Sequence, residues 1–587
     1  MSSNQPLTRR QWLRGAAAGA ASVAALPLLT ACAPALPKIE DLPGGFTGKA
    51  LERGHALRPQ WQRLAQGLDL PAPAAVYRVP VLIAGGGMAG LAAARALELA
   101  GVQGAALLDT QETMGGNSRG GMVQGVACPL GAHYLPVPGD DAHEVQDLLQ
   151  ELGLRRRVAG RWQYEETALC HSPQERLYWQ GAWHEGLLPV QGVDHKTLEQ
   201  YQRFADLVQR EAKAAHYAMP AIRVWEQAAR LPPAHAALDE QLFAGWLAAN
   251  GIEDERLLWY LNYCCRDDFG AGIDRVSAWA GVHYFASRHG FSAPRALTDG
   301  LHEDDASEHG DQVLTWPEGN GWLAAQLVNR LRHTEVVTDC SVLAITEGKE
   351  GVQIDTYHHG RQRPERWLAG RCVVALPTFI AARVVQNPPN FLRRVATKLD
   401  WAPWLVANIH VNSPLADFTG AEAAWDNVLY DDPNTGGLGY VDAGNQRLDR
   451  MTRAPTALTY YQALGDWRDG REQLLQQPFE FWRERIVNSL SQPHPDLLLR
   501  ATRMDITRYG HAMAIPRPGD QQLLSAIALG SSASKPSQAR VNGEAVRLLP
   551  TPQTTRLSFA HSDWAGYSVL EEAFTRGHHA GLWSALT

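Results

Sequence analysis

The chain has 587 residues, with 54 lysine and arginine residues against 62 aspartate and glutamate residues, which gives a formal net charge of −8 at pH 7. This acidic balance argues against a nucleic-acid-binding protein, because contacts to phosphate groups need a basic face. The length predicts several domains, and the contents of 45% hydrophobic and 20% charged residues are ordinary for a soluble globular protein.

The first 32 residues resemble an export signal. Residues 8–14 read TRRQWLR, and the apolar run that follows, GAAAGAASVAALPLL, is too short and too rich in Ala and Gly for a stable membrane span. The pattern resembles a twin-arginine signal, whose translocation machinery carries proteins that are already folded. Residues 29–32 read LTAC and resemble a lipobox, in which Cys32 would be lipidated, although residues 31–33 also read as an ordinary small-x-small cleavage site.

We therefore expect a periplasmic or otherwise extracytoplasmic protein that contacts a membrane only through its signal or through a lipid on Cys32. Residues 33–75 are rich in Pro, Gly and Ala, and they are predicted to form a tether with a short polar helix near 51–66.

The next segment predicts a dinucleotide site. Residues 79–84 form a continuous apolar run, typical of a parallel strand buried on both faces, and residues 85–90 then read GGGMAG before a helix-forming stretch. In such a turn the first glycine allows the tight bend, the second lets a pyrophosphate approach the backbone, and the third lets the helix pack closely on the sheet. A second strand at 105–108 ends in an acid placed to bind a ribose hydroxyl. The predicted contacts are Gly85, Gly87, Met88, Ala89, Gly90 and Asp109.

The glycine motif alone leaves FAD and NAD open, but further segments resemble the flavin-containing amine oxidase superfamily. Residues 113–119, TMGGNSR, resemble the second glycine pair of that family, and residues 130–135, LGAHYL, resemble its segment next to the flavin ring. Outside the cytoplasm no nicotinamide pool is available for exchange, which also favours a tightly held FAD. The resemblance implies that Gly115, Gly116 and Arg119 contact FAD. Asn117 stands where the family usually has an arginine, and Arg119 would take over the contact of that arginine. His133 and Tyr134 are candidate catalytic residues from their position.

Residues 140–300 are predicted to form a helical substrate or cap region. Apolar residues recur at helical spacing in 141–153, 196–218, 238–249 and 276–288. Within this region the sequence Arg266-Asp267-Asp268 could hold a cationic substrate or form a surface ion network. The adjacent Cys264 and Cys265 are expected to be reduced and buried, and no cysteine or histidine spacing predicts a metal site.

Residues 301–385 resemble the second FAD segment of the family. Residues 316–323, WPEGNGWL, open a predicted amphipathic helix, and strands are predicted at 336–339 and 341–346 before a hairpin that ends in CVVALP. The resemblance implies that the backbone near Val342 meets the adenine side of FAD.

Residues 386–540 are predicted to be a mixed α/β substrate domain. Four aromatic side chains could line a tunnel for an amine or could pack in the core: Trp401, Trp404, Tyr460 and Tyr461. The predicted strand at 401–411 resembles the family strand that often carries a lysine near flavin N5, yet it has none, and Lys398 precedes it. The missing lysine favours a dehydrogenase over an oxidase.

Residues 541–587 resemble the closing FAD segment. The sequence LSFAHSD at 557–563, followed by SVLEEAFTRG at 568–577, resembles a strand, an acidic turn and a helix. The resemblance implies that Asp563 holds the ribityl chain and that the helix N-terminus faces the N1/C2=O edge of the flavin. Val569 occupies the position of the aromatic-cage tyrosine, with Tyr567 two residues away. No cysteine follows Cys372, so we expect noncovalent FAD.

Together these segments predict an α/β fold. A Rossmann-like FAD-binding domain with a parallel sheet would be assembled from residues 76–139, 301–385 and 541–587, beside a mixed α/β and helical substrate domain. The predicted activity is oxidation of a small, polyamine-like amine by hydride transfer to flavin N5, with O2, a quinone or another electron carrier as acceptor. Two alternatives stay open: a desaturase or porphyrinogen-type dehydrogenase acting on C–C or ring C–H bonds, and an exported flavin-binding protein without turnover.

Overall fold

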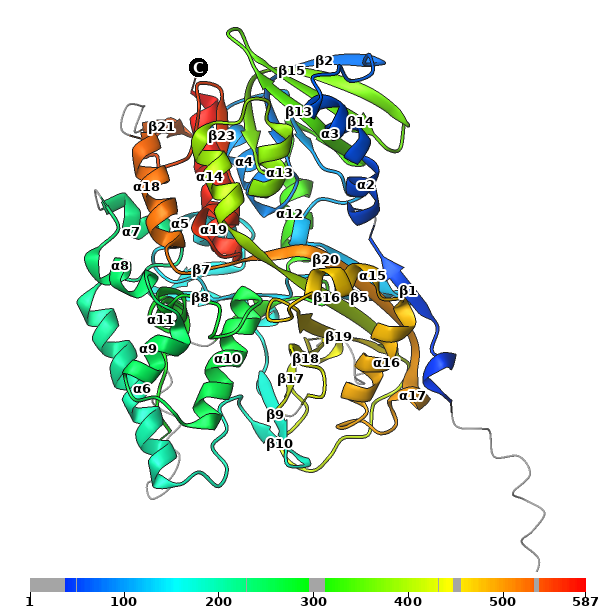
Figure 1. The fold of residues 1–587 in the computed structure, drawn as a ribbon, viewed down its shortest axis with the longest axis vertical. Coiled ribbons are helices and arrows are strands. Elements are labelled where there is room, and N and C mark those ends of the chain that lie inside the picture. Colours follow the sequence, from blue (N-terminus) through cyan, green and yellow to red (C-terminus); the bar gives the residue numbers. More distant parts are fainter. Residues whose placement is uncertain are drawn as a thin grey trace, which may run out of the picture.

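The computed structural model describes residues 37–48, 50–227, 230–294, 312–430, 432–446, 455–532 and 538–586. Two large sheets and a group of helices organise these residues (Figure 1). The predicted export signal and Cys32 lie outside the described residues. Within the described ranges, no helix combines the length and the apolar character that crossing a membrane requires.

The first sheet, called the nucleotide sheet below, carries the predicted glycine turn and lies at the top of Figure 1. Strands β12, β3, β2 and β15 follow one another in parallel pairing, β23 pairs in parallel with β15, and β14 and β13 continue the sheet antiparallel. Three separate stretches of the chain supply these strands, which confirms the predicted fold class. The strands are β2 (Ala75–Ala84), β3 (Ala105–Leu108), β12 (Thr334–Val337), β13 (Cys340–Glu347), β14 (Val352–His358), β15 (Arg363–Val374) and β23 (Leu557–Phe559).

Helices cover both faces of the nucleotide sheet because its central strands are apolar on both sides. Val81 and Ile83 of β2 pack in one cluster with α4 (Met88–Leu99) and α19 (Leu570–Ala585). Leu82 and Ala84 point the other way, toward α13 (Thr378–Val384), α14 (Asn390–Lys398) and α18 (Asp520–Ser532). The continuous apolar run that predicted a doubly covered strand is therefore explained by these two layers.

Helices α4 and α19 approach each other closely enough to require glycine. A Cβ atom at Gly577 would overlap the carbonyl oxygen of Ala89, and one at Gly581 would crowd the carbonyl oxygen of Ala93. The C-terminal helix is thus seated directly on the first helix of the nucleotide-binding unit (Figure 1).

The second sheet, called the substrate sheet, has the strand order β1-β20-β16-β19-β18-β17-β9-β10. Alternate residues of β16 face opposite layers: Leu405 and Ile409 pack with α16 (Phe479–Leu490), whereas Trp404 and Val406 face the cap helices. The strands are β1 (Gly44–Thr47), β9 (Glu175–Trp179), β10 (Ala182–Glu185), β16 (Asp400–Val411), β17 (Asp426–Leu429), β18 (Gly437–Asp442), β19 (Thr456–Ala463) and β20 (Ala501–Ile515).

The stretch 140–300 is predominantly helical, as the apolar spacing predicted, but it also contains strands. The hairpin of β7 (Arg155–Val158) and β8 (Arg161–Tyr164) precedes β9 and β10, which join the substrate sheet through β17. The helices are α5 (His143–Glu151), α6 (His195–Ala214), α7 (Ile222–Gln227), α8 (Pro233–Asp239), α9 (Phe243–Ala249), α10 (Glu255–Phe269) and α11 (Ala278–Tyr284), followed by a π-helical turn (Phe285–His289).

Residues 37–75, which we expected to form a tether, are built into the body of the protein where they are described. Strand β1 pairs in parallel with the edge strand β20, and Leu42 is buried just before it. Two helices follow, α2 (Ala50–Ala56) and α3 (Arg58–Ala65), and Arg53 forms an ion pair with Asp339 next to the nucleotide sheet. The high content of Pro and Gly in this stretch therefore did not indicate a free linker, because its described residues pair and pack with the two sheets.

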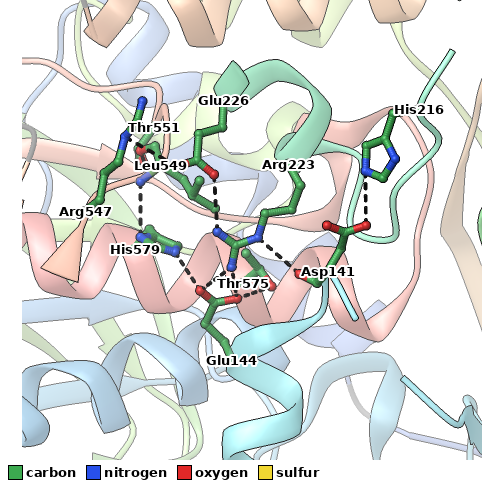
Figure 2. Close-up of polar contacts among 10 residues, drawn as sticks. All are labelled: Asp141, Glu144, His216, Arg223, Glu226, Arg547, Leu549, Thr551, Thr575 and His579. Carbon is green, nitrogen blue, oxygen red and sulfur yellow. Dashed lines mark hydrogen bonds and ion pairs between the residues drawn. The ribbon is translucent and has the colours of Figure 1, made fainter. Parts of the chain in front are cut away.

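A buried polar network joins the cap to the C-terminal helix (Figure 2). The carboxylate of Glu144 on α5 accepts hydrogen bonds from Arg223 Nη2 at 2.6 and 2.7 Å, from Thr575 Oγ1 at 3.1 Å and from His579 Nε2 at 2.9 Å. His579 Nδ1 in turn accepts the backbone N–H of Leu549 at 3.2 Å, so the ring proton lies on Nε2. Burial alone would raise the pKa of Glu144, but these donors and the Arg223 charge hold it well below its usual value.

Candidate active site

A cavity of about 320 Å³ is lined by residues of both sheets and of the cap. One end is formed by the glycine turn between β2 and α4, and the other by side chains of β16, β19, β20 and α10. Among the residues predicted to act in the site, those that line the cavity are Gly85, Gly87, Met88, Ala89, Asp109, Gly115, Gly116, His133, Tyr134 and Asp563. Gly90, Arg119 and Val342 lie behind the lining.

The glycines of the turn are needed for different reasons. Gly85 has a positive φ of 106°, and a Cβ atom at Gly90 would overlap the carbonyl oxygen of Gly85. The protein's own backbone therefore requires glycine at both positions. Gly87 differs, because the nearest protein atom to a Cβ there would be the Cα of Gly116 at 3.8 Å. The protein leaves this space free, which fits the close approach of a pyrophosphate at the start of α4.

The second glycine pair is joined directly to the first. Gly115 forms a parallel bridge with Gly87, and its N–H donates to the carbonyl oxygen of Gly86 at 2.7 Å. Gly115 and Gly116 both have positive φ values, 123° and 59°. The two turns therefore form one continuous backbone cradle at the dinucleotide end of the cavity.

Asp109 ends β3 at the edge of this cradle. Its Oδ2 accepts the N–H of Gly86 and its Oδ1 the N–H of Gln111, both at 2.7 Å. Burial raises the pKa of Asp109, an effect that these two hydrogen bonds and the nearby charge of Arg119 oppose. The carboxylate lines the cavity and fits the ribose-binding role that the sequence predicted.

Two other predicted cofactor contacts occupy supporting positions. Arg119 is buried and donates from Nε to the carbonyl oxygen of Gly116 at 3.0 Å, which fixes the second glycine turn from behind. Val342 lies in β13, and its neighbour Ser341 donates from Oγ to Thr110 Oγ1 at 3.1 Å, next to the end of β3. Their predicted contacts with the cofactor stay predictions.

Asp563 forms a buried anchor in the short 3-10 helix Ser562–Ala565, ahead of α19. Its Oδ2 accepts the N–H and the hydroxyl of Thr378 at 2.9 and 3.0 Å, and its Oδ1 lies 3.1 Å from His561 Nδ1. Burial would raise the pKa of Asp563, but His561 and Thr378 lower it, so the carboxylate is ionised. Val569 and Leu570, six and seven residues after Asp563, bring the N-terminus of α19 to the cavity wall. The glycine cradle, Asp109, Asp563 and this helix end together fit an FAD.

The candidate catalytic residues form one wall of the substrate end. His133 stacks on Tyr461 with ring centroids 4.4 Å apart, and its carbonyl oxygen accepts the hydroxyl of Thr315 at 2.9 Å. Burial lowers the pKa of His133 to about 3, so its imidazole is neutral near pH 7 and acts as an aromatic wall. Tyr134 donates its hydroxyl to Asp267 Oδ2 at 3.3 Å, and burial raises its pKa well above the usual value.

The four aromatic residues that could line a tunnel or pack in the core divide between the cavity wall and the core. Trp401, Trp404 and Tyr461 line the cavity, whereas Tyr460 points to the opposite face of β19 and donates to Asp432 at 3.3 Å. Tyr567 is fully buried, donates to Glu572 at 2.8 Å and does not line the cavity, whereas Val569 does line it.

The sequence analysis missed the contribution of β20 to this wall. Tyr509, His511, Ala512 and Met513 line the cavity, and the hydroxyl of Tyr509 donates to the carbonyl oxygen of Leu130 at 2.7 Å. Pairing of β20 with β16 brings these residues opposite Trp401 and Trp404. No local pattern in residues 508–513 could reveal this pairing across a hundred residues.

An acidic group closes the substrate end. Asp267 and Asp268 of α10 both line the cavity, so this pair is not a surface ion network. Asp268 lies 3.6 Å from Arg288, which itself lies 3.3 Å from Glu571 on α19. Burial and the neighbouring charge of Asp268 raise the pKa of Asp267 to about 7, and burial raises that of Asp268 to about 6 against the opposing charge of Arg288. Arg266, the first residue of the predicted triplet, does not line the cavity.

Lys398 takes no part in the cavity. Its Nζ donates to the carbonyl oxygen of Pro518 at 3.0 Å and lies 3.7 Å from Asp520. No lysine belongs to the described residues that line the cavity. This agrees with the absence of a lysine from β16.

The chain and its fold are similar to those of known flavoproteins. A model of the family described as flavin containing amine oxidoreductase matches residues 88–580. Wild-type putrescine oxidase bound to putrescine superposes with a TM-score of 0.56 at 15% identity, over 86% of this chain and 98% of that one. No curated protein sequence matches the chain.

Two further solved structures share the fold. Cyclohexylamine oxidase from Brevibacterium oxydans IH-35A superposes with a TM-score of 0.57 at 16% identity, over 86% of this chain and 98% of that one. A CLA-producing fatty acid isomerase from P. acnes gives a TM-score of 0.54 at 15% identity, over 85% and 97%. At these identities the likeness establishes the fold alone, which serves amine and fatty-acid chemistry alike.

Proposed function

Because the chain belongs to the family of flavin-containing amine oxidoreductases, we propose that this FAD-dependent oxidoreductase oxidises a small, polyamine-like aliphatic amine. One observation carries the proposal: the cavity that contains the glycine cradle ends in aromatic rings and in the carboxylate of Asp267. Aromatic faces and a carboxylate are the groups that attract an ammonium ion. A fatty acid or a porphyrinogen carries carboxylates, which this acidic end would repel.

The residues of the cavity would orient and dehydrate the amine. Trp404, Tyr461 and the neutral ring of His133 form walls that replace water around the reacting carbon. Asn320 donates from Nδ2 to the carbonyl oxygen of Tyr134 at 2.7 Å and so fixes the segment that carries both candidate residues. When bound, FAD supplies the acceptor for the hydride that leaves the C–H bond beside nitrogen.

An anaerobic reduction assay tests the proposed substrate class. Purified protein with its FAD is mixed with putrescine, spermidine, spermine and monoamines, and loss of the flavin absorbance is followed without oxygen. We expect at least one amine to bleach the flavin. Bleaching by a porphyrinogen or an unsaturated lipid but by no amine would support the C–C alternative. Bound FAD that no compound reduces would support a flavin-binding protein without turnover.

We also propose that the reduced enzyme passes its electrons to a quinone or another carrier faster than to O2. The cavity wall contains no lysine among the described residues, and Lys398 is engaged with Pro518 and Asp520. Amine-reduced enzyme should therefore reoxidise faster with a water-soluble quinone than with oxygen. Rapid, stoichiometric release of hydrogen peroxide in air would show oxidase behaviour instead.

Export is proposed from the sequence of the first residues. The paired Arg9 and Arg10 precede an apolar run and Cys32, which supports twin-arginine transport followed by lipidation. Changing Arg9→Lys together with Arg10→Lys should leave the protein in the cytoplasm, whereas Arg14→Lys, a matched change outside the pair, should not. Cys32→Ser should move the exported protein from the membrane fraction to the soluble fraction, and an unchanged distribution would argue against the lipid.

A further inference from the structure

The two adjacent carboxylates of α10 differ in their partners. The side chain of Asp268 is only 7% exposed and lies within ion-pair distance of Arg288, whereas Asp267 accepts a hydrogen bond from the hydroxyl of Tyr134. Arg288 is itself 9% exposed, and it is shared between Asp268 and Glu571. Asp268 is therefore paired with a buried cation, whereas Asp267 is paired with a neutral hydroxyl group.

Arg288 has spare hydrogen-bonding capacity where it lines the cavity. Its Nε and Nη1 atoms are buried and have no hydrogen-bond acceptor in the described structure, because its ion pair with Asp268 is too long for a hydrogen bond. A buried guanidinium in this state acts on Asp268 mainly through its charge. The charge of Arg288 favours the ionised form of Asp268 more than that of Asp267.

The other groups around Asp267 do not neutralise it. Asp268 and Arg266 stand beside it on α10, Arg288 faces it from the π-helical turn, and Tyr134 faces it from the strand β6 (Tyr134–Pro136). Asp426 of β17 adds a further nearby carboxylate, whose pKa burial and the charge of Asp267 raise well above its usual value. Burial and the charge of Asp268 outweigh the charges of Arg288 and Arg266, so Asp267 holds a proton more firmly than an isolated aspartate does.

An amine substrate needs such a group. An alkyl ammonium has a pKa of about 10, so the amine arrives protonated at neutral pH, yet its nitrogen must offer a lone pair before the neighbouring C–H can leave as hydride. Pairs of acids whose environments separate their proton affinities identify acid–base roles. Resting on the proposed function, we infer that Asp267 accepts the proton of the bound substrate ammonium, while Asp268, Arg288 and Glu571 are positioning residues that set its charge environment.

The step balances in protons and electrons. An N–H bond of the ammonium breaks, its electron pair stays on nitrogen, and the proton forms an O–H bond with the Asp267 carboxylate. The C–H bond beside nitrogen then breaks and its two electrons leave with the hydride, for which bound FAD would be the acceptor, while the nitrogen lone pair forms the C=N bond. The cationic iminium leaves, and Asp267 returns its proton to water.

The pH dependence of anaerobic reduction by an amine tests this inference. In the unchanged protein, the second-order rate constant should fall as the pH drops below about 7, because a protonated Asp267 cannot accept the ammonium proton. In Asp267→Asn only the free amine can react, so the rate constant at pH 7 should drop by roughly 10²–10³-fold. It should then rise about tenfold per pH unit toward the pKa of the amine and approach the value of the unchanged protein.

Two variants move the acid limb in opposite directions. Asp268→Asn removes the charge that raises the pKa of Asp267, so the fall in rate should shift to lower pH. Tyr134→Phe removes the hydrogen bond that lowers the pKa of Asp267, so the fall should shift to higher pH. These shifts read out the role even if Asp267→Asn fails to fold, and FAD content with circular dichroism checks each variant.

Three results would overturn the inference: an Asp267→Asn profile like that of the unchanged protein, a loss in Asp267→Asn that high pH does not restore, or acid limbs that stay fixed in the other two variants. Failure of the proposed function looks different, since then no amine would reduce the unchanged protein at any pH.

Discussion

At the scale of single residues, Gly87 and Gly90 separate what the backbone needs from what the cofactor needs. A Cβ atom at Gly87 meets nothing closer than 3.8 Å, whereas one at Gly90 overlaps the carbonyl oxygen of Gly85. Gly87→Ala should therefore fold with an unchanged melting temperature as apoprotein and bind FAD roughly tenfold more weakly or worse, a cost of about 1.4 kcal/mol. Gly90→Ala should destabilise the apoprotein itself, by about 1–3 kcal/mol.

Thermal unfolding of apoprotein and titration with FAD measure the two effects separately. Gly54→Ala is the control, because nothing lies within 4 Å of its added Cβ atom and its φ is not positive. Gly101→Ala would not serve, since Gly101 has a positive φ. Equal FAD affinity in Gly87→Ala and the unchanged protein would contradict the placement of the pyrophosphate at this turn.

Local spacing was enough to predict the residues of the glycine cradle, because a tight turn fixes its neighbours within a few positions. Gly85, Gly87 and Asp109 line the cavity for this reason. Asp267 and Tyr509 could not be placed in the same way. Their positions depend on α10 and β20, which reach the cavity only through pairing and packing with residues more than a hundred positions away.

At the scale of elements, the contact between α4 and α19 depends on the absence of side chains. Gly577→Ala would place a methyl group on the carbonyl oxygen of Ala89, a residue that also lines the cavity. We expect a loss of stability of about 1–3 kcal/mol, together with a lower FAD content, because α19 must move away from α4. Urea denaturation and the ratio of flavin to protein absorbance measure both effects.

Gly530→Ala in α18 is the matched control, because a Cβ there meets nothing within 4 Å. Its effect should be a gain of up to about 1 kcal/mol from better helix propensity, with unchanged FAD content. If Gly577→Ala behaved in the same way, the two helices would not be in the close contact described.

The elements themselves were predicted unevenly. The long helix α6, which begins at Asp194, agrees with the predicted segment 196–218. Helix α10, which begins at Asp254, lies in the region 140–300 that was predicted to be helical but outside its four predicted segments. Strand β2 begins four residues earlier than the apolar run indicated, at Ala75, because its first half alternates between half-buried and exposed residues. β9 and β10 were missed because their partner β17 lies some 250 residues later.

At the scale of the whole molecule, the Glu144 network joins α5, α7 and α19 (Figure 2). The pKa of Glu144 is lower in the folded than in the unfolded protein, so its stabilising contribution is complete above the unfolded value and is lost as the pH falls through the folded one. Glu144→Gln removes the closer carboxylate partner of the buried Arg223, which keeps only the longer ion pair with Glu226 at 3.5 Å, and should cost about 3 kcal/mol at pH 7.

This cost should shrink as the pH falls below about 4.5, where the unfolded glutamate becomes protonated. Urea midpoints at pH 7 and pH 4 measure the trend. Glu226→Gln, which removes the longer ion pairs with Arg547 at 3.4 Å and with Arg223 at 3.5 Å but leaves the hydrogen bonds of Glu144 in place, should cost less than Glu144→Gln at pH 7. A cost for Glu144→Gln that did not depend on pH would contradict the ionised state of this carboxylate.

The late position of β23 and α19 has a consequence for how the chain matures. The strand β15 cannot pair with β23, and α4 cannot pack against α19, until synthesis has reached residues 557–585, more than 400 residues after the first glycine turn. At a synthesis rate of about 5–20 residues per second, the first glycine turn is exposed for tens of seconds before its cover exists. A chain that ended before residue 557 would therefore lack the strand, the aspartate and the helix that complete the FAD site, however complete its catalytic residues were.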